Sequence, residues 1–229
     1  LWNERRLAFF LTFPLDPQTR FVVELRPGAR AVSGQESRKT FSWDITIRPP
    51  DILFLKLKEV GGELWLWDSL KRAATPLTED EGTVLDYAVS RSGQQIAYSK
   101  HKASGGSDLW IMGRNGNNLR RVLDCGSDLC DQPAFSLDET YIAYSRNAFD
   151  ETTNLYEPSR IWTINVETAE TAQLYQSEFA FGHSPSFSPD GEKLASYDTT
   201  QNAIRILDLN TSQDSVLPSV NQENGDWSQ

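Results

Sequence analysis

The sequence contains few of the residues from which metal, redox and acid–base sites are built. Its 229 residues include 2 cysteines, 2 histidines and 1 methionine. No apolar run approaches the roughly 18 residues that a membrane-spanning helix needs. The motifs of P-loops, EF-hands, dinucleotide-binding folds and zinc peptidases do not occur, and neither does the G-x-S-x-G elbow of serine hydrolases. We therefore expect no cofactor, no metal and no membrane span, while a lipid anchor on a longer form of the protein is compatible with these absences.

Positive charge is also scarce over most of the chain. The formal net charge is −10. Residues 1–50 carry 8 Lys and Arg against 5 Asp and Glu, so the excess of negative charge lies in residues 51–229. Binding to a phosphate backbone needs clustered Lys and Arg, and this distribution therefore argues against nucleic acid as a partner. Either the acidic surface serves solubility alone, or it favours a cationic partner.

One short pattern occurs three times. A hydrophobic residue and a serine lead into a polar turn, and an alternating segment follows the turn. The serines, Ser90, Ser136 and Ser188, are 46 and 52 residues apart, and the added length lies in two loops, residues 100–107 and 147–159. The copies read AVSRSGQQIAYSK from Ala88, AFSLDETYIAYSR from Ala134 and SFSPDGEKLASYD from Ser186.

A second alternating segment follows each copy, and alternation of this kind indicates a strand. A tight turn and a short further strand complete each unit, which makes four strands per repeat. A period of about 40 residues with four strands is typical of a β-propeller blade. The predicted third strands are Asp108–Gly113, Arg160–Asn165 and Ala203–Asp208, with a further copy at Glu63–Asp68.

The polar turn of the third copy reads SPDG. Pro189 presets φ near −65°, Asp190 caps the turn and Gly191 supplies a positive φ. The other copies read SRSG and SLDE, so the turn tolerates change. We interpret it as a structural hairpin rather than as a catalytic element.

The repeats P-x-F-S-P-D-G-x-x-L-A and I-W-x-I-N resemble those of TolB-like, WD-type β-propellers of the bacterial envelope. The resemblance covers about residues 51–229 and implies an all-β fold with at least four four-stranded blades, present in whole or in part. It also implies that this domain is an incomplete piece of a larger, six-bladed propeller. Closure as a four-bladed ring, with Trp227 and Ser228 in an inner strand, is the alternative. The family includes scaffolds, receptors and the propeller domains of some peptidases, so the resemblance says less about function than about fold.

Residues 1–50 lack the repeat, and they predict strands at Leu7–Phe13, Arg20–Leu25 and Lys39–Ile47. The segment PLDPQTRFVVELRPGARAVSG resembles the later half of a bacterial Ig-like domain of the surface-layer type. This resemblance implies a partial β-sandwich at residues 1–50, joined by a short proline linker to the propeller domain at residues 51–229. Three strands do not close a sandwich, so we expect residues outside this chain, or a second copy, to cover the apolar side chains. These are Phe9, Phe13, Val22, Phe41 and Trp43.

Cys125 and Cys130 are five positions apart, between the outer strand of one predicted blade and the inner strand of the next. We favour a disulfide, which would indicate an oxidising, extracytoplasmic compartment. The alternatives are two free thiols, or a mixed metal site with the neighbouring carboxylates of Asp124, Asp128 and Asp131.

Tryptophan recurs in the predicted third strands. The recurrence predicts packing between adjacent blades, and a carbohydrate-binding platform is the alternative. The residues are Trp65, Trp67, Trp110 and Trp162.

The residues just before the inner strands line one mouth of a propeller. Carboxylates there suit a cationic or amide-rich ligand, such as a peptide segment of a protein partner. The alternative is that these aspartates only cap loops. A further alternative is that His183 acts as a catalytic base. His101 lies in a Lys-flanked loop, and we expect it to be solvated. The predicted ligand-binding residues are Asp86, Asp131, Gln132, His183, Ser184 and Asp226.

These observations favour a non-catalytic binding or scaffold module of the bacterial cell envelope, periplasmic or on the cell surface, that acts through protein or peptide interaction. The alternative is the propeller domain of a serine peptidase whose hydrolase domain lies outside this chain. A nucleophile elbow encoded downstream would decide for the peptidase, and a lipoprotein signal upstream would favour the binding module.

Overall fold

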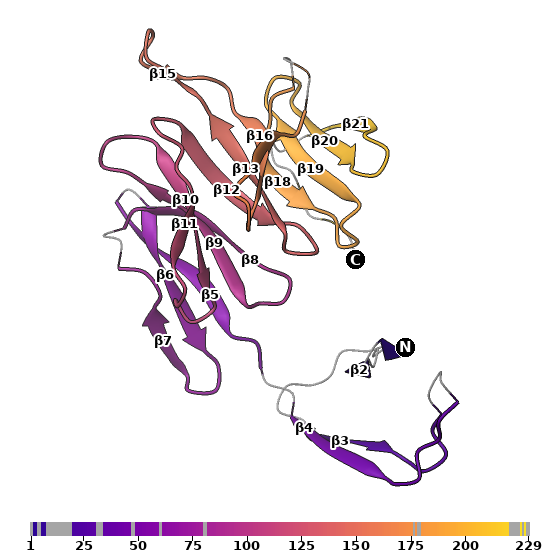
Figure 1. Cartoon of the computed structure of the whole chain (residues 1–229). Helices are drawn as coiled ribbons and strands as arrows, with labels where there is room; N and C mark the ends of the chain where they lie inside the picture. Colours follow the sequence, from indigo (N-terminus) through magenta and orange to yellow (C-terminus); the bar gives the residue numbers. More distant parts are fainter. Residues whose placement is uncertain are drawn as a thin grey trace. The chain divides into compact units, whose positions relative to one another are not determined.

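The computed structural model describes residues 2–3, 6–7, 20–30, 34–46, 49–59, 61–79, 82–175, 177, 180–219, 225 and 227. Every regular element among them is a β-strand, which confirms the all-β prediction (Figure 1). Internal contacts divide the chain into two units. The smaller unit contains Leu1–Ile52 and Leu66–Thr75, and the larger contains Leu53–Trp65 and Pro76–Gln229.

The larger unit contains three successive sets of four antiparallel strands, here called blades 1, 2 and 3. Within each blade the strands lie side by side in the order in which the chain visits them, as propeller blades do. Blade 1 consists of β8 (Val84–Val89), β9 (Gln95–His101), β10 (Ser107–Gly113) and β11 (Arg120–Leu123); blade 2 of β12 (Leu129–Phe135), β13 (Tyr141–Asn147), β16 (Arg160–Asn165) and β17 (Thr171–Gln173); and blade 3 of β18 (His183–Phe187), β19 (Lys193–Asp198), β20 (Ala203–Asp208) and β21 (Asp214–Pro218).

Three strands precede blade 1 and belong to a partial blade. They are β5 (Ile52–Lys58), β6 (Gly61–Asp68) and β7 (Ala73–Pro76), in the spatial order β5-β6-β7. β6 meets β8 of blade 1 at the register pair Gly62–Val84. The number of blades in the intact protein, and a ring closed through Trp227 and Ser228, stay predictions, because Ser228 lies outside the described residues.

The register between the second and third strands repeats from blade to blade. Tyr98 pairs with Trp110 in blade 1, and Tyr144 pairs with Trp162 in blade 2. The bounds of β10, β16 and β20 confirm the three third strands predicted from the alternating segments.

The core lies between neighbouring blades, since each blade buries one face against the next. One cluster joins blades 1 and 2, a second joins blades 2 and 3, and a third joins β6 to blade 1. Trp162 packs against the first cluster and Trp110 against the third, as the recurrence of tryptophan predicts. Full burial of a large apolar side chain stabilises the fold by about 1.5–3 kcal/mol. The fully buried members include Leu64, Leu109, Ile142, Tyr144, Ile161, Ile164 and Leu194.

The turn between the first two strands recurs in all three blades. Gly191 in blade 3 and Gly93 in blade 1 have φ of 75° and 67°, whereas Glu139 occupies this position in blade 2 with φ of 62°. A residue with a side chain is strained at positive φ. The carboxylate of Glu139 accepts hydrogen bonds from the amide (2.5 Å) and the hydroxyl (3.1 Å) of Ser92 in the neighbouring turn. The departure from the SPDG pattern thus links blades 1 and 2.

The described part of the smaller unit contains a hairpin of β3 (Arg20–Leu25) and β4 (Phe41–Thr46). Side chains alternate along a strand, and Val22 stands opposite Asp44 on the face that carries the Arg20–Asp44 ion pair. Val22 therefore lies on the opposite face of the hairpin from Phe41 and Trp43, and what covers these side chains stays a prediction. The apolar face consists of Phe21, Val23, Leu25, Phe41, Trp43 and Ile45.

The remaining expectations for the first fifty residues are only partly covered by the structure. β1 (Trp2–Asn3) pairs with β2 (Arg6–Leu7), and the rest of the predicted strand Leu7–Phe13, with Phe9 and Phe13, lies outside the described residues. The Ig-like half-sandwich and its boundary near residue 50 stay predictions.

Candidate functional site

The predicted mouth residues lie where the three inner strands begin. β8, β12 and β18 each have a break in register there, between Val84 and Asp86, between Asp131 and Ala134, and between His183 and Ser186. Such β-bulges bend the strand and re-aim side chains. At two of the breaks a residue other than glycine has positive φ: Gln132 at 54° and Ser184 at 53°.

One buried serine links two acidic residues of neighbouring blades. The hydroxyl of Ser99 on β9 donates to Oδ1 of Asp131 (2.6 Å) and accepts the backbone amide of Asp86 (3.2 Å). Oδ1 of Asp86 accepts the amide of Tyr87 (2.7 Å), and Oδ1 of Asp131 accepts the amide of Gln132 (2.7 Å). The second oxygen of each carboxylate accepts no hydrogen bond from a described residue, so each keeps acceptor capacity for a ligand.

Burial and like charge act together on Asp86. Loss of solvent raises the pKa of Asp86 above its ordinary value of 3.8, the amide of Tyr87 lowers it in part, and the negative charge of Asp131 raises it further. No described cation forms an ion pair with either carboxylate. The pair therefore carries uncompensated negative charge that a bound cation would relieve.

A second link of the same kind joins blades 2 and 3. Oε1 of Gln132 accepts hydrogen bonds from the hydroxyl of Ser145 on β13 (2.8 Å) and from the backbone amide of Ser184 (2.8 Å). Ser145 occupies the position in blade 2 that Ser99 occupies in blade 1. The buried serine at the end of the second strand thus ties each of these blades to the inner strand of the next.

His183 lies at the start of blade 3. Its Nδ1 shares a hydrogen bond with the hydroxyl of Ser184 (2.8 Å), and its ring lies 5.2 Å from that of Tyr197. Burial lowers the pKa of His183 below 6.5, so the imidazole is neutral near pH 7. In a Ser–His–Asp triad, a carboxylate bound to the second imidazole nitrogen orients the base. Among the described residues, no carboxylate binds the second nitrogen of His183.

The structure thus brings together five of the six predicted mouth residues: Asp86, Asp131, Gln132, His183 and Ser184. Asp226 lies outside the described residues, and its neighbour Trp227 donates from Nε1 to the carbonyl of Ser186 on β18 (3.3 Å). Sequence reasoning missed Ser99 and Ser145. The signal that could have identified them is that each follows the tyrosine of its repeat, in IAYSK and in IAYSR.

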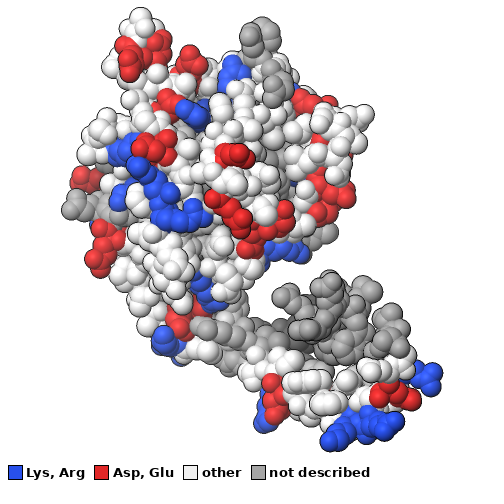
Figure 2. All heavy atoms as spheres, in the orientation of Figure 1, with Lys and Arg blue, Asp and Glu red and all other residues white. Residues whose placement is uncertain are grey.

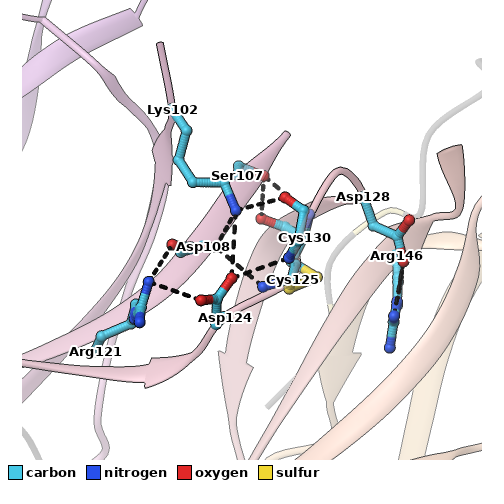
Figure 3. Close-up of polar contacts among 10 residues, drawn as sticks. Lys102, Ser107, Asp108, Arg121, Asp124, Cys125, Asp128, Cys130 and Arg146 are labelled. Atoms are coloured by element: carbon cyan, nitrogen blue, oxygen red, sulfur yellow. Dashed lines mark hydrogen bonds and ion pairs between the residues drawn. A yellow bond between two sulfur atoms is a disulfide. The ribbon is translucent and has the colours of Figure 1, made fainter. Parts of the chain in front are cut away.

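Cys125 and Cys130 form a disulfide, which confirms the favoured prediction (Figure 3). Its loop leads from β11 directly into the mouth at Asp131. Asp108, buried beside it, accepts hydrogen bonds from Lys102 (2.6 Å), Arg121 (3.1 Å) and the amide of Cys125 (3.0 Å).

The alternative of a metal site in this loop is not supported. Asp124 pairs with Lys102 and Arg121, and Asp128 pairs with Arg146 (2.7 Å). The described residues contain no group of three side chains placed to hold a metal ion. They also include no helix with the length and apolar character that crossing a bilayer requires.

No protein-family model matches the sequence, and no curated protein matches it. Among solved structures, TolB from Acinetobacter baumannii has a TM-score of 0.58 at 15% identity, over 92% of this chain and 56% of TolB. A putative TolB from Agrobacterium tumefaciens has a TM-score of 0.51 at 16% identity, over 80% of this chain and 66% of that one. An oligogalacturonate lyase in complex with manganese has a TM-score of 0.53 at 15% identity, over 69% and 42%.

At these identities the similarity shows the fold alone. The chain has a TolB-like β-propeller fold, and it spans little more than half of the Acinetobacter TolB and less than half of the lyase.

Proposed function

We propose that this chain of TolB-like fold is a non-catalytic binding module of the cell envelope, which holds a basic segment of a protein partner at the mouth of its inner strands. The observation that carries the proposal is the pair Asp86 and Asp131. Each carboxylate is half-buried, each has an oxygen without a described donor, and no described cation neutralises either of them.

The chemistry of the site fits a cationic ligand better than the other classes. A Lys or Arg side chain would supply both the missing donors and the missing charge, and charge-assisted hydrogen bonds to carboxylates are among the stronger ones. Nucleic acid would be repelled by this end of the strands. Gln132 adds an amide that can bond the backbone of an extended peptide.

Two observations support the envelope as the compartment. A disulfide persists in oxidising environments and is rare in the reducing cytosol. The repeats also resemble those of envelope propellers, and two of the similar structures carry the name TolB. Alkylation in intact cells of the native host, followed by fractionation, tests this part: Cys125 and Cys130 should resist alkylation without reductant.

The binding function is tested with two labelled peptides of twelve residues, one alternating Lys with Ser and Gly, the other with Glu in place of each Lys. Fluorescence anisotropy at low salt should show binding of the Lys peptide and none of the Glu peptide. Equal binding of the two peptides, or binding of neither, would contradict the proposal.

A further inference from the structure

The insertion in blade 2 forms a projecting hairpin, here called the arm (residues 148–157). Its strands β14 (Phe149–Asp150) and β15 (Leu155–Tyr156) pair with each other, apart from the four strands of the blade. Figure 1 shows the arm standing out from the blade near the label β15. The arm begins three residues after Ser145 of β13, and Ser145 belongs to the hydrogen-bond network of the candidate site. The arm and the candidate site therefore lie at the same end of the blades.

The base of the arm is fixed by the disulfide loop. Oδ1 of Asp128 accepts the amide of Phe149 (2.9 Å), and Oδ2 pairs with Arg146 (2.7 Å), whose contact with Asp128 is drawn in Figure 3. The side chain of Asn147 donates to the carbonyl of Glu157 (3.0 Å), which closes the base from the other side. These contacts fix the direction in which the arm leaves the blade.

The arm also has an ordered interior. Oδ1 of Asp150 accepts the amide of Thr152 (2.8 Å) and Oδ2 accepts the hydroxyl of Thr153 (2.8 Å), so this carboxylate builds the turn. The rings of Phe149 and Tyr156 meet edge to face at 5.1 Å. The arm is therefore preorganised, which lowers the entropic cost of binding.

The outer surface of the arm is apolar and acidic. Leu155 is 66% exposed and Tyr156 is 40% exposed. The side chains of Glu151 and Glu157 are exposed and make no hydrogen bond or ion pair with a described residue, and residues 147–159 contain no Lys or Arg. Figure 2 shows acidic atoms gathered on this projection. A surface that combines these groups fits a partner with an apolar side chain flanked by cations.

We infer that the arm is a second contact surface for the partner bound at the mouth. A basic segment lies with its cations on Asp86 and Asp131, and farther along it places an apolar side chain against Leu155 and further cations on Glu151 and Glu157. The inference rests on the proposed function. An extended segment of twelve residues reaches about 40 Å.

The test begins with random twelve-residue peptides displayed on phage and selected on the wild-type protein. Enriched peptides are synthesised, and their affinities are measured by calorimetry. The arm variant is Glu151→Gln, Leu155→Ser, Glu157→Gln, and the mouth variant is Asp86→Asn, Asp131→Asn. Leu119→Ser is the matched control. Leu119 is 53% exposed, and it follows the end of β10 that lies away from the arm. Circular dichroism and thermal unfolding check that each variant is folded.

The inference predicts enriched peptides that combine Lys or Arg with an aliphatic or aromatic residue. Their affinity should fall at least tenfold for the arm variant and for the mouth variant, and stay unchanged for the control. Loss in the mouth variant alone overturns the inference and leaves the proposed function standing. Loss in the arm variant alone contradicts both, as does unchanged affinity in both or the absence of enriched peptides. Self-association abolished by the arm variant would show that the arm binds a second copy, and would also overturn the inference.

Discussion

The hydroxyl of Ser99 in blade 1 donates a hydrogen bond of 2.6 Å to the carboxylate of Asp131 in blade 2. Ser99 is fully buried, and it also accepts the amide of Asp86. One hydroxyl thus bonds the carboxylate of Asp131 and the backbone of Asp86, and it crosses the interface between two blades. The binding site and the blade interface consequently depend on the same bond.

Ser99→Ala should therefore destabilise the protein. The substitution leaves the half-buried amide of Asp86 without its acceptor and removes one of the two donors to Oδ1 of Asp131, a loss of about 1–3 kcal/mol. Urea unfolding followed by tryptophan fluorescence measures it. Ser215→Ala on the exposed strand β21 is the control and should stay within about 0.5 kcal/mol of the wild type. Equal stability of Ser99→Ala and the control would show that the link contributes nothing.

Asp86→Asn should stabilise the protein at pH 7. Burial, with the charge of Asp131, raises the pKa of Asp86 in the folded state, so its ionised form opposes folding once the pH exceeds the unfolded pKa. Asparagine keeps the oxygen that accepts the amide of Tyr87 and removes the charge. The difference in urea midpoint should be largest at neutral pH and should vanish below about pH 4. A variant less stable than the wild type at pH 7 contradicts this account of the site.

Loss of the disulfide should have a modest effect on folding. The loop between Cys125 and Cys130 is short, so the loop-entropy model assigns it about 2 kcal/mol. The double variant Cys125→Ser, Cys130→Ser should lose about this amount in urea unfolding, and dithiothreitol should lower the stability of the wild type but not of the variant. If dithiothreitol also lowered the stability of the variant, the effect of the reductant could not be assigned to the disulfide.

Arg205→Met should be among the most destabilising single changes in blade 3. Arg205 pairs with the fully buried Asp198 (2.8 Å) and with Asp214. Breaking a buried pair by removing one partner costs about 3–5 kcal/mol. The loss should be measured by urea unfolding, with Arg91→Met, an exposed arginine in the turn between β8 and β9, as a comparison of smaller effect.

The pH dependence of this pair gives a second readout. Burial raises the pKa of Asp198, but hydrogen bonds from Thr200 and Arg205 outweigh it and the net pKa lies below 3.8. The pair therefore stabilises the protein above that value and loses its contribution as the pH falls through the folded pKa. The difference in unfolding free energy between the wild type and Arg205→Met should become smaller as the pH falls. A difference that grows on acidification would contradict the assignment.

Much of the propeller could be predicted from the sequence, because a repeat states the same strand pattern several times. Alternation located β10, β16 and β20, and the position between two strands placed Cys125 and Cys130 in an interblade loop. Glu139 shows the limit of such reasoning. It replaces a turn glycine, and only the structure shows that its carboxylate reaches Ser92 in the next turn.

The residues of the candidate site could be predicted from the sequence, but the hydrogen bonds that join them could not. The starts of the inner strands were recognisable, yet Ser99 and Asp131 are far apart in sequence and meet only because β9 and β12 pack together and a bulge re-aims Asp131. The alternation of β3 was visible too. Its register with β4, which places Val22 opposite Asp44, depends on the turn that joins them, and periodicity does not encode that register.

The most direct test of the central claim is the affinity of the Lys-containing peptide for the wild type and for Asp86→Asn, Asp131→Asn, measured by anisotropy over a range of salt concentrations. The account predicts wild-type affinity that falls steadily as salt rises, because salt screens the carboxylates. For the double variant it predicts affinity at least tenfold weaker at low salt, with little dependence on salt. A double variant that binds the peptide as tightly as the wild type, with the same salt dependence, would contradict the account.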